Sequence, residues 1–250
     1  LVTLSEVKAG ERVLEVGCGR GDLTSALLRH EASVIGLEID ADLIPVLEQR
    51  FAQELKTGQL KLHHVNARDI DWGQFAVERL LSNVPYNLTR YFLRQSLVQL
   101  PQVKTMGFTL QVEAAERLLA LGPQAKDYNS KLYGPLAILR HSYGTGKIVH
   151  RFRRQDFDPP PHVDSVFVVL KSHNPSSFYL KHSKAFYEII EMAFQQRRKT
   201  LHNNWRKAWP WQRGELQHFL ETEGLKGKRA EEVELGHWES LGEKIVDRFY

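Results

Sequence analysis

The chain has 250 residues, a formal net charge of +4 and 42% hydrophobic residues, enough for one large domain with a core and a smaller one. Its single cysteine excludes an intrachain disulfide and a cysteine-cluster zinc site, and favours a reducing compartment. No apolar run approaches the roughly 18 residues that a membrane-spanning helix needs, and the start lacks a signal-peptide layout. We therefore expect a soluble, cytoplasmic protein whose basic charge is compatible with a polyanionic partner.

A strand, a glycine-rich loop and a helical run follow one another near the start of the chain. The strand covers residues 11–16, and this order is typical of nucleotide-binding loops. Asp22 occupies the place where a dinucleotide fingerprint has its third glycine or alanine. The G-x-G-x-G spacing instead resembles the first motif of S-adenosylmethionine (SAM) methyltransferases. Its glycines are Gly17, Gly19 and Gly21.

The second predicted strand, residues 33–40, ends in acidic residues. Glu38 lies about 20 residues after the glycine loop, where a carboxylate would accept hydrogen bonds from both ribose hydroxyls of a nucleoside. Asp40 is expected to cap a helix over residues 41–55, because an Asp before a helical run accepts from free backbone amides.

The third predicted strand, residues 60–65, leads into Asn66. In the methyltransferase class that the glycine loop resembles, an Asp at this point accepts from the adenine amino group of SAM. Asn66 can still accept through its side-chain oxygen, and Asp69 is a competing candidate. His63 and His64 point to opposite sides of the strand, so we expect no metal site there.

The fourth predicted strand is an apolar run that ends in Asn83, Val84, Pro85 and Tyr86. The Asn83 side-chain oxygen and the Val84 carbonyl can both accept hydrogen bonds from the exocyclic amino group of a flat heterocycle. Tyr86 offers a ring on which a base can stack for roughly 1–3 kcal/mol. The plainer alternative is a turn, because strands often stop at Asn-x-Pro.

Alternating strands and helices continue beyond this motif. We predict a helix over residues 88–100, a strand over 105–111 and a helix over 111–119. With right-handed crossovers, this pattern gives an α/β fold: a mostly parallel, doubly wound, Rossmann-like sheet. Ligands of such sheets bind at the carboxyl ends of the strands, where the glycine loop and the polar strand ends should converge.

Residues 133–139 and 147–152 are expected to flank a turn at Gly144-Thr145-Gly146. Between residues 140 and 154 the chain has five Lys or Arg residues and no acid. Such a segment is either a solvated face or a contact for a phosphate backbone. The residues proposed for the second role are Arg151, Arg153 and Arg154.

Phe157 begins a loop with three consecutive prolines, followed by a strand over residues 166–170. Phe157 either plugs the core under a rigid loop or forms an aromatic clamp with Tyr86 around an extruded base.

The composition changes at residues 172–177, which we interpret as a linker between a catalytic domain, residues 1–172, and a helical carboxyl-terminal domain, residues 178–250. Helices are predicted over residues 184–194, from about 198, over 213–223 and over 238–249. The basic residues Arg197, Arg198 and Lys199 either complement a helix dipole or bind RNA phosphates. The predicted small core consists of Trp205, Trp209 and Trp211.

Several motifs occur together and in order: Glu-Val-Gly-x-Gly-x-Gly from 15, Asn-Val-Pro-Tyr-Asn from 83, Leu-Gln-x-Glu from 110, Phe-x-Pro-Pro-Pro-x-Val-Asp-Ser from 157 and Gln-Arg-Arg-Lys-Thr-Leu from 196. This combination resembles the ribosomal RNA adenine dimethyltransferases, and within them the KsgA (RsmA) type. The resemblance covers almost the whole chain, including Arg-Ala-Glu-Glu at 229–232.

The resemblance implies a SAM-dependent enzyme, without a metal, that dimethylates N6 of two adjacent adenines near the 3′ end of small-subunit (16S) ribosomal RNA during ribosome biogenesis. The implied partner is ribosomal RNA in the small subunit, bound by a monomer. The implied catalytic residues are Asn83, Val84, Pro85, Tyr86 and Phe157. The implied cofactor-binding residues are Glu15, Gly17, Gly19, Gly21, Glu38, Ile39, Asn66, Ala67 and Asn83. The implied RNA-binding residues are Arg151, Arg153, Arg154, Arg197, Arg198 and Lys199.

Two departures from the family pattern stand out. The amino-terminal Phe-Gly-Gln-Asn-Phe-Leu segment, which helps to enclose the cofactor in the family, does not occur in this sequence, and this departure bears on SAM affinity. The Lys that usually follows Gln111 is Val112. Three alternatives stay open: an Erm-type methyltransferase acting on 23S ribosomal RNA, a non-catalytic RNA-binding or transcription factor on the same scaffold, and a DNA adenine methylase.

Overall fold

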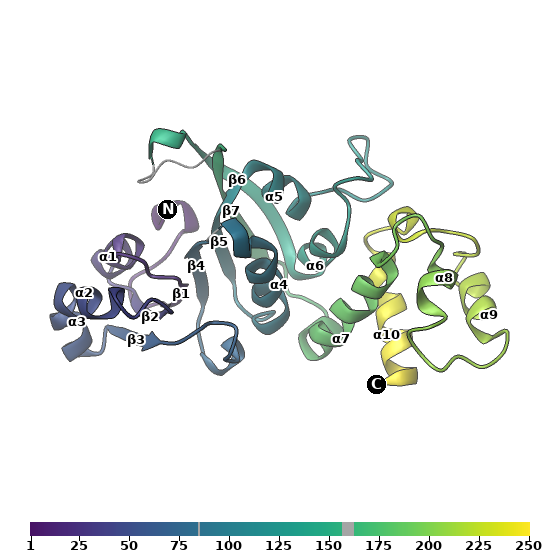
Figure 1. Ribbon diagram of the computed structural model, residues 1–250, viewed down its shortest axis with the longest axis horizontal. Coiled ribbons are helices and arrows are strands. Elements are labelled where there is room, and N and C mark those ends of the chain that lie inside the picture. Colours follow the sequence, from purple (N-terminus) through teal and green to yellow (C-terminus); the bar gives the residue numbers. More distant parts are fainter. Residues whose placement is uncertain (85, 157–162) are drawn as a thin grey trace. The chain divides into compact units, whose positions relative to one another are not determined.

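A seven-stranded sheet organises the first part of the computed structural model (Figure 1), which describes residues 1–84, 86–156 and 163–250. The strand order is β3-β2-β1-β4-β5-β7-β6. Neighbours from β3 to β5 pair in parallel, whereas β7 pairs antiparallel with both β5 and β6. The predicted doubly wound, mostly parallel sheet is therefore confirmed. The strands are β1 (Arg12–Val16), β2 (Ser33–Glu38), β3 (Leu60–His64), β4 (Arg79–Asn83), β5 (Thr105–Gln111), β6 (Gly144–Phe152) and β7 (Ser165–Ser172).

Short helices precede, connect and follow the strands of this sheet. They are η1 (Thr3–Ser5), α1 (Asp22–Arg29), α2 (Leu43–Arg50), α3 (Ala52–Thr57), η2 (Trp72–Gln74), η3 (Tyr86–Leu88), α4 (Thr89–Gln99), α5 (Val112–Leu118) and η4 (Arg154–Asp156). The single helix predicted over residues 41–55 is two helices, because the backbone leaves helical geometry at Phe51 (φ −118°, ψ 30°). The prediction that Asp40 caps this helix is wrong: the N-cap of α2 is Asp42, and the Asp40 side chain accepts from the Asp42 amide at 2.9 Å within the preceding turn.

The turn predicted at Gly144-Thr145-Gly146 is wrong. These residues begin strand β6, and residues 135–143 before them form helix α6 (Pro135–Tyr143). A Cβ atom on Gly144 would lie 2.0 Å from the carbonyl oxygen of Lys171. The glycine therefore allows two paired strands to approach closely, and tertiary pairing overrides the local turn signal.

The chain divides into two compact units. The first contains Leu1–Ala115 and Gly144–Asn174, and the second contains Glu116–Tyr143 and Pro175–Tyr250. The chain thus crosses between the units three times. The sequence-based limits, 1–172 and 178–250, place residues 116–143 with the sheet, whereas these residues make their contacts among the helices of the second unit.

Aromatic side chains fill the core of the second unit. Trp205 and Trp238 are fully buried. The Tyr133 hydroxyl accepts from the Trp238 indole at 2.9 Å and donates to the Val233 carbonyl at 2.8 Å. Of the three tryptophans predicted for this core, only Trp205 is fully buried; Trp209 and Trp211 are half-buried and pack around Phe249. The helices of the unit are α6, α7 (Ser177–Phe194), α8 (Leu201–Trp205), α9 (Glu215–Thr222), η5 (Ala230–Glu232) and α10 (His237–Phe249).

Helix α7 begins at Ser177, earlier than predicted, because Ser176 caps it: its hydroxyl accepts from the Tyr179 amide at 3.1 Å. Among the described helices, none has the length and apolar character required to cross a membrane.

Candidate active site

A cavity of about 450 Å³ opens at the carboxyl ends of the first four strands. Its wall is formed by the glycine loop after β1, the end of β2, the loop after β3 and the end of β4. Four segments that are far apart in the sequence therefore meet, as the sheet topology predicts. The expected site residues in this wall are Glu15, Gly17, Gly19, Glu38, Ile39, Asn66, Ala67 and Asn83.

The glycine loop takes a backbone path that other residues rarely adopt. Gly17, Gly19 and Gly21 all have positive φ angles, between 56° and 87°. Gly21 is not part of the cavity wall, but a Cβ atom there would lie 2.5 Å from the Phe51 ring. Gly21 therefore lets the start of α1 pack against the helix pair α2–α3, which positions the loop.

The Glu38 carboxylate is almost completely buried (5% exposed) and is held by backbone amides. One oxygen accepts from the Gly19 amide at 2.8 Å; the other accepts from the amides of Ile39 and Asp40 at 2.8 and 2.9 Å. An ionised carboxylate has about four acceptor positions, so one position is left for a ligand hydroxyl. Glu38 thus joins the end of β2 to the glycine loop before any ligand binds.

Glu15, another acid of the wall, is 1% exposed. One of its oxygens accepts from the Thr24 hydroxyl at 2.7 Å, and the other has no hydrogen-bond partner. Burial raises the pKa of Glu15 to about 8, with a smaller contribution from the charge of Glu38. Sequence reasoning included Thr24 in the glycine-loop motif but gave it no role, since a Thr in the first turn of a helix carries no functional signal by itself.

Asn66 lies in the wall, whereas Asp69 is exposed and does not line the cavity. The Asn66 side-chain oxygen accepts from the Arg68 amide at 3.1 Å, which fixes its amide group at the cavity rim. Of the two residues that the sequence offers for the cofactor adenine, Asn66 is therefore the better placed.

Asn83 is the last residue of β4, and its exposed side chain contributes to the cavity wall. The preceding residue, Ser82, donates from its hydroxyl to the Val16 carbonyl at 2.6 Å, so the ends of β4 and β1 are tied together. Val84 is 2% exposed. Pro85, Phe157 and the side chain of Tyr86 lie outside the described residues, and their predicted roles stay predictions.

The basic residues at the end of β6 are exposed. Arg153 pairs with Asp156 and Arg154 pairs with Asp164, each at 3.2 Å. The acids come from positions just beyond the acid-free segment. Exposed pairs of this kind contribute little stability and can exchange for a phosphate.

Arg197, in the second unit, differs from its basic neighbours. Its guanidinium donates to the carbonyls of Ser130 and Tyr133, the latter at 3.0 Å, and pairs with Glu231 at 3.0 Å. Arg197 is therefore a structural link between three segments, while Arg198 and Lys199 are exposed. The basic residues 197–199 therefore comprise one structural arginine and two exposed cations.

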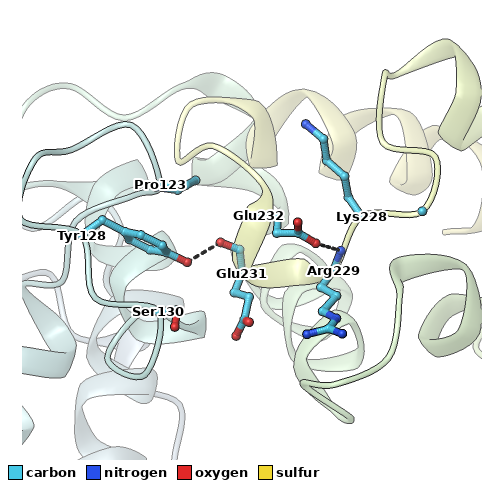
Figure 2. Close-up of a pocket in the computed structure, with 8 residues that line it drawn as sticks. Pro123, Tyr128, Ser130, Lys228, Arg229, Glu231 and Glu232 are labelled. Atoms are coloured by element: carbon cyan, nitrogen blue, oxygen red, sulfur yellow. Dashed lines mark hydrogen bonds between the residues drawn. The ribbon is translucent and has the colours of Figure 1, made fainter.

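A second cavity, of about 760 Å³, lies beside these contacts in the second unit (Figure 2). The Tyr128 hydroxyl donates to the Glu231 carbonyl at 2.6 Å, and the Arg229 amide donates to the Glu232 carboxylate at 2.7 Å. The wall of this second cavity contains the acids Glu231 and Glu232 and the cations Lys228 and Arg229. The sequence singled out residues 229–232 only as a motif.

The strand order, the glycine loop and the buried acid at the end of β2 define the fold of a SAM-dependent methyltransferase. The sequence model of the family described as ribosomal RNA adenine dimethylase matches residues 1–243. The chain belongs to this family, and it is an enzyme of the RNA methyltransferase class.

Named relatives and solved structures are consistent with this family and fold. The ribosomal RNA small subunit methyltransferase A of Pseudomonas putida is 32% identical over 96% of this chain and 86% of that protein. The protein of the same name from Clostridium botulinum is 30% identical over 97% and 86%. A dimethyladenosine transferase from Plasmodium falciparum shares the fold, with a TM-score of 0.75 at 24% identity over 99% of this chain and 94% of that one. The 23S rRNA methyltransferase ErmE also shares it, with a TM-score of 0.62 at 20% identity over 98% and 95%.

Proposed function

We propose that this chain transfers methyl groups from SAM to N6 of two adjacent adenines near the 3′ end of small-subunit ribosomal RNA, twice per adenine, during ribosome biogenesis. Family membership supplies the adenine and the ribosomal RNA, and the names of its relatives supply the small subunit. The observation that carries the proposal is that the glycine loop, Glu38, Asn66 and Asn83 border a single cavity.

The cavity suits a cationic nucleoside such as SAM. Its wall contains the acids Glu15 and Glu38, and an unpartnered oxygen of Glu15 is available for a donor. Opposite charges attract strongly in such a partly enclosed site. In this proposal Glu38 accepts from the ribose, Asn66 from the adenine amino group, and the glycine loop passes the methionine part. When bound, SAM supplies the electrophilic methyl group.

Asn83 and Val84 orient the acceptor nitrogen. The N6 lone pair of adenine is delocalised into the ring, so the nitrogen is a poor nucleophile. Two acceptors, the Asn83 side-chain oxygen and the Val84 carbonyl, hold both N–H groups and let the nitrogen become pyramidal. The methylated nitrogen then loses its proton readily, so alignment and exclusion of water supply most of the acceleration.

Extruding the base costs a few kcal/mol, which stacking between Tyr86 and Phe157 would offset. Arg151, Arg153, Arg154, Arg198 and Lys199 are exposed and remain our candidates for phosphate contacts. We infer that the protein is cytoplasmic, since its proposed substrate is part of the small ribosomal subunit that is assembled there. We also infer that it acts as a monomer.

The test is an assay with radiolabelled SAM and small ribosomal subunits that lack the modification, followed by mapping of the labelled nucleotide. We expect label on two adjacent adenines near the 3′ end. Naked 23S RNA, the Erm-type substrate, and duplex DNA are the comparison substrates. Label on either one, or none on small subunits, would overturn the proposal.

A further inference from the structure

One tyrosine and two arginines form a cluster beside the cavity. The guanidinium carbon of Arg68 lies 5.1 Å from the centre of the Tyr91 ring, and that of Arg94 lies 5.3 Å from it. We call Arg68, Tyr91 and Arg94 the arginine–tyrosine cluster. Arg68 also lines the cavity, so the cluster borders the cavity at the loop after β3. None of its three members belongs to the basic residues considered above.

The core of the first unit holds this cluster in place. Trp72 is fully buried; its indole donates to the Ala67 carbonyl at 2.8 Å, and its ring packs edge-on against Phe92 at 5.7 Å. Ala67 immediately precedes Arg68, and Phe92 immediately follows Tyr91. One buried side chain therefore contacts the neighbours of both Arg68 and Tyr91. The cluster is built by packing and does not depend on surface side chains alone.

The cluster carries net positive charge. Each guanidinium gains about 0.5–1 kcal/mol from the ring, but the two cations repel each other. Among the described residues, no carboxylate forms an ion pair with Arg68. Asp69 is the acid whose charge acts on the Tyr91 hydroxyl, and partial burial is the main cause that raises the pKa of Tyr91. Arg68 therefore offers a guanidinium beside the ring that an anionic ligand could reach.

The charged residues around the cavity indicate the chemical class of ligand that the arginine–tyrosine cluster would bind. The acids Glu15 and Glu38 face the space proposed for the cationic cofactor, while Arg68 stands at the rim. A guanidinium is suited to phosphate oxygens because its planar donors match them in pairs. Arg90 is exposed one helical turn before Arg94, so it adds a third cation to the same face of α4.

We propose that the arginine–tyrosine cluster binds the phosphate backbone of the RNA strand next to the extruded adenine. The ligand class rests on the function proposed above. The inference adds a phosphate contact on the catalytic unit itself, supplied by the loop after β3 and by α4.

The test uses Arg68→Gln and Arg94→Gln in the whole chain. Binding of unmodified small ribosomal subunits is measured at several KCl concentrations and constant Mg²⁺, and SAM binding is measured separately by calorimetry. Each variant should lower the salt slope of RNA binding by about 0.7, equivalent to about fivefold weaker binding at 0.1 M salt. Arg94 does not line the cavity, so the SAM dissociation constant of Arg94→Gln should stay within about twofold of wild type, which also shows that this variant is folded.

Arg29→Gln is the matched control, because it removes one charge from α1, where Arg29 bonds to Ser25. Its salt slope should equal that of wild type. Tyr91→Phe should behave as wild type because the ring remains, whereas Tyr91→Ala should weaken RNA binding. Unchanged slopes in both arginine variants, or weaker SAM binding with an unchanged slope, would overturn the proposal. Failure of the proposed function is a separate result, since wild type would then leave small subunits unlabelled.

Discussion

At the scale of single residues, Glu15 is expected to stay uncharged until the cofactor binds. Its carboxyl is buried, has one free oxygen and has a pKa raised from 4.5 to about 8. The proton therefore stays on Glu15 at neutral pH while the cavity contains no cation. A cationic cofactor would favour the ionised form, so proton release is expected to accompany binding.

Glu15→Gln should flatten the dependence of stability on pH. The folded protein keeps a proton that the unfolded chain releases near pH 4.5, so this contribution is complete below that pH and is lost as pH rises to about 8. Over this window the free energy of unfolding should fall by up to about 1.4 kcal/mol per pH unit more in wild type than in the variant. Urea unfolding without SAM at pH 5.5, 6.5 and 7.5 measures it. Parallel pH curves for the two proteins would contradict the assignment.

Asn83→Ala should reduce methyl transfer by about 100-fold or more, because the acceptor nitrogen loses the group that aligns it. Glu38, Asn66 and the glycine loop are untouched, so SAM affinity should stay near that of wild type. Single-turnover methylation and calorimetric SAM binding measure the two effects. Turnover equal to that of wild type would falsify the role of Asn83.

At the scale of elements, two adjacent arginines just after α7 are expected to have different roles: Arg197 in stability and Arg198 in RNA binding. Arg197→Gln removes hydrogen bonds to two carbonyls and an ion pair with Glu231, so it should lower the free energy of unfolding by about 1–3 kcal/mol. Arg198→Gln should change stability by less than about 0.5 kcal/mol, since Arg198 is exposed.

In RNA binding the two variants should show the opposite order, with the larger effect in Arg198→Gln. Arg198→Gln should lower the salt slope by about 0.7, as loss of one phosphate contact requires. Denaturation and RNA titration of both variants give the comparison. If Arg197→Gln were as stable as wild type, its contacts would not be structural.

Strand β6 shows where element prediction failed. Gly-Thr-Gly is a strong local signal for a turn, yet Gly144 pairs with Ser172, and β6 continues to Phe152. The helix over 41–55 was predicted in the right place but without its break at Phe51. The first difference arises from a packing partner distant in sequence, because Gly144 lies against the Lys171 carbonyl.

At the scale of the whole molecule, the cavity belongs entirely to the first unit. SAM should therefore slow hydrogen exchange in the glycine loop and at the ends of β2 and β4, and leave α7 to α10 nearly unchanged. Saturation at 100 times the dissociation constant stabilises the binding state by about 2.7 kcal/mol, a large effect for exchange mass spectrometry. Protection of similar size in the second unit would contradict a binding site confined to the first.

The sequence by itself determined the strand and helix alternation, the glycine loop and the polar strand ends, because periodicity and motif chemistry are contained in short windows. It placed Glu38, Asn66 and Asn83 at one sheet edge through topology alone. Only the tertiary structure decided which oxygens are already occupied, since Gly19 reaches Glu38 and Thr24 reaches Glu15 across the fold. It also decided that Arg197 is structural, that residues 116–143 pack with the helices, and that Trp72 sets Arg68 beside Tyr91. These outcomes depend on contacts between distant residues, which no local pattern encodes.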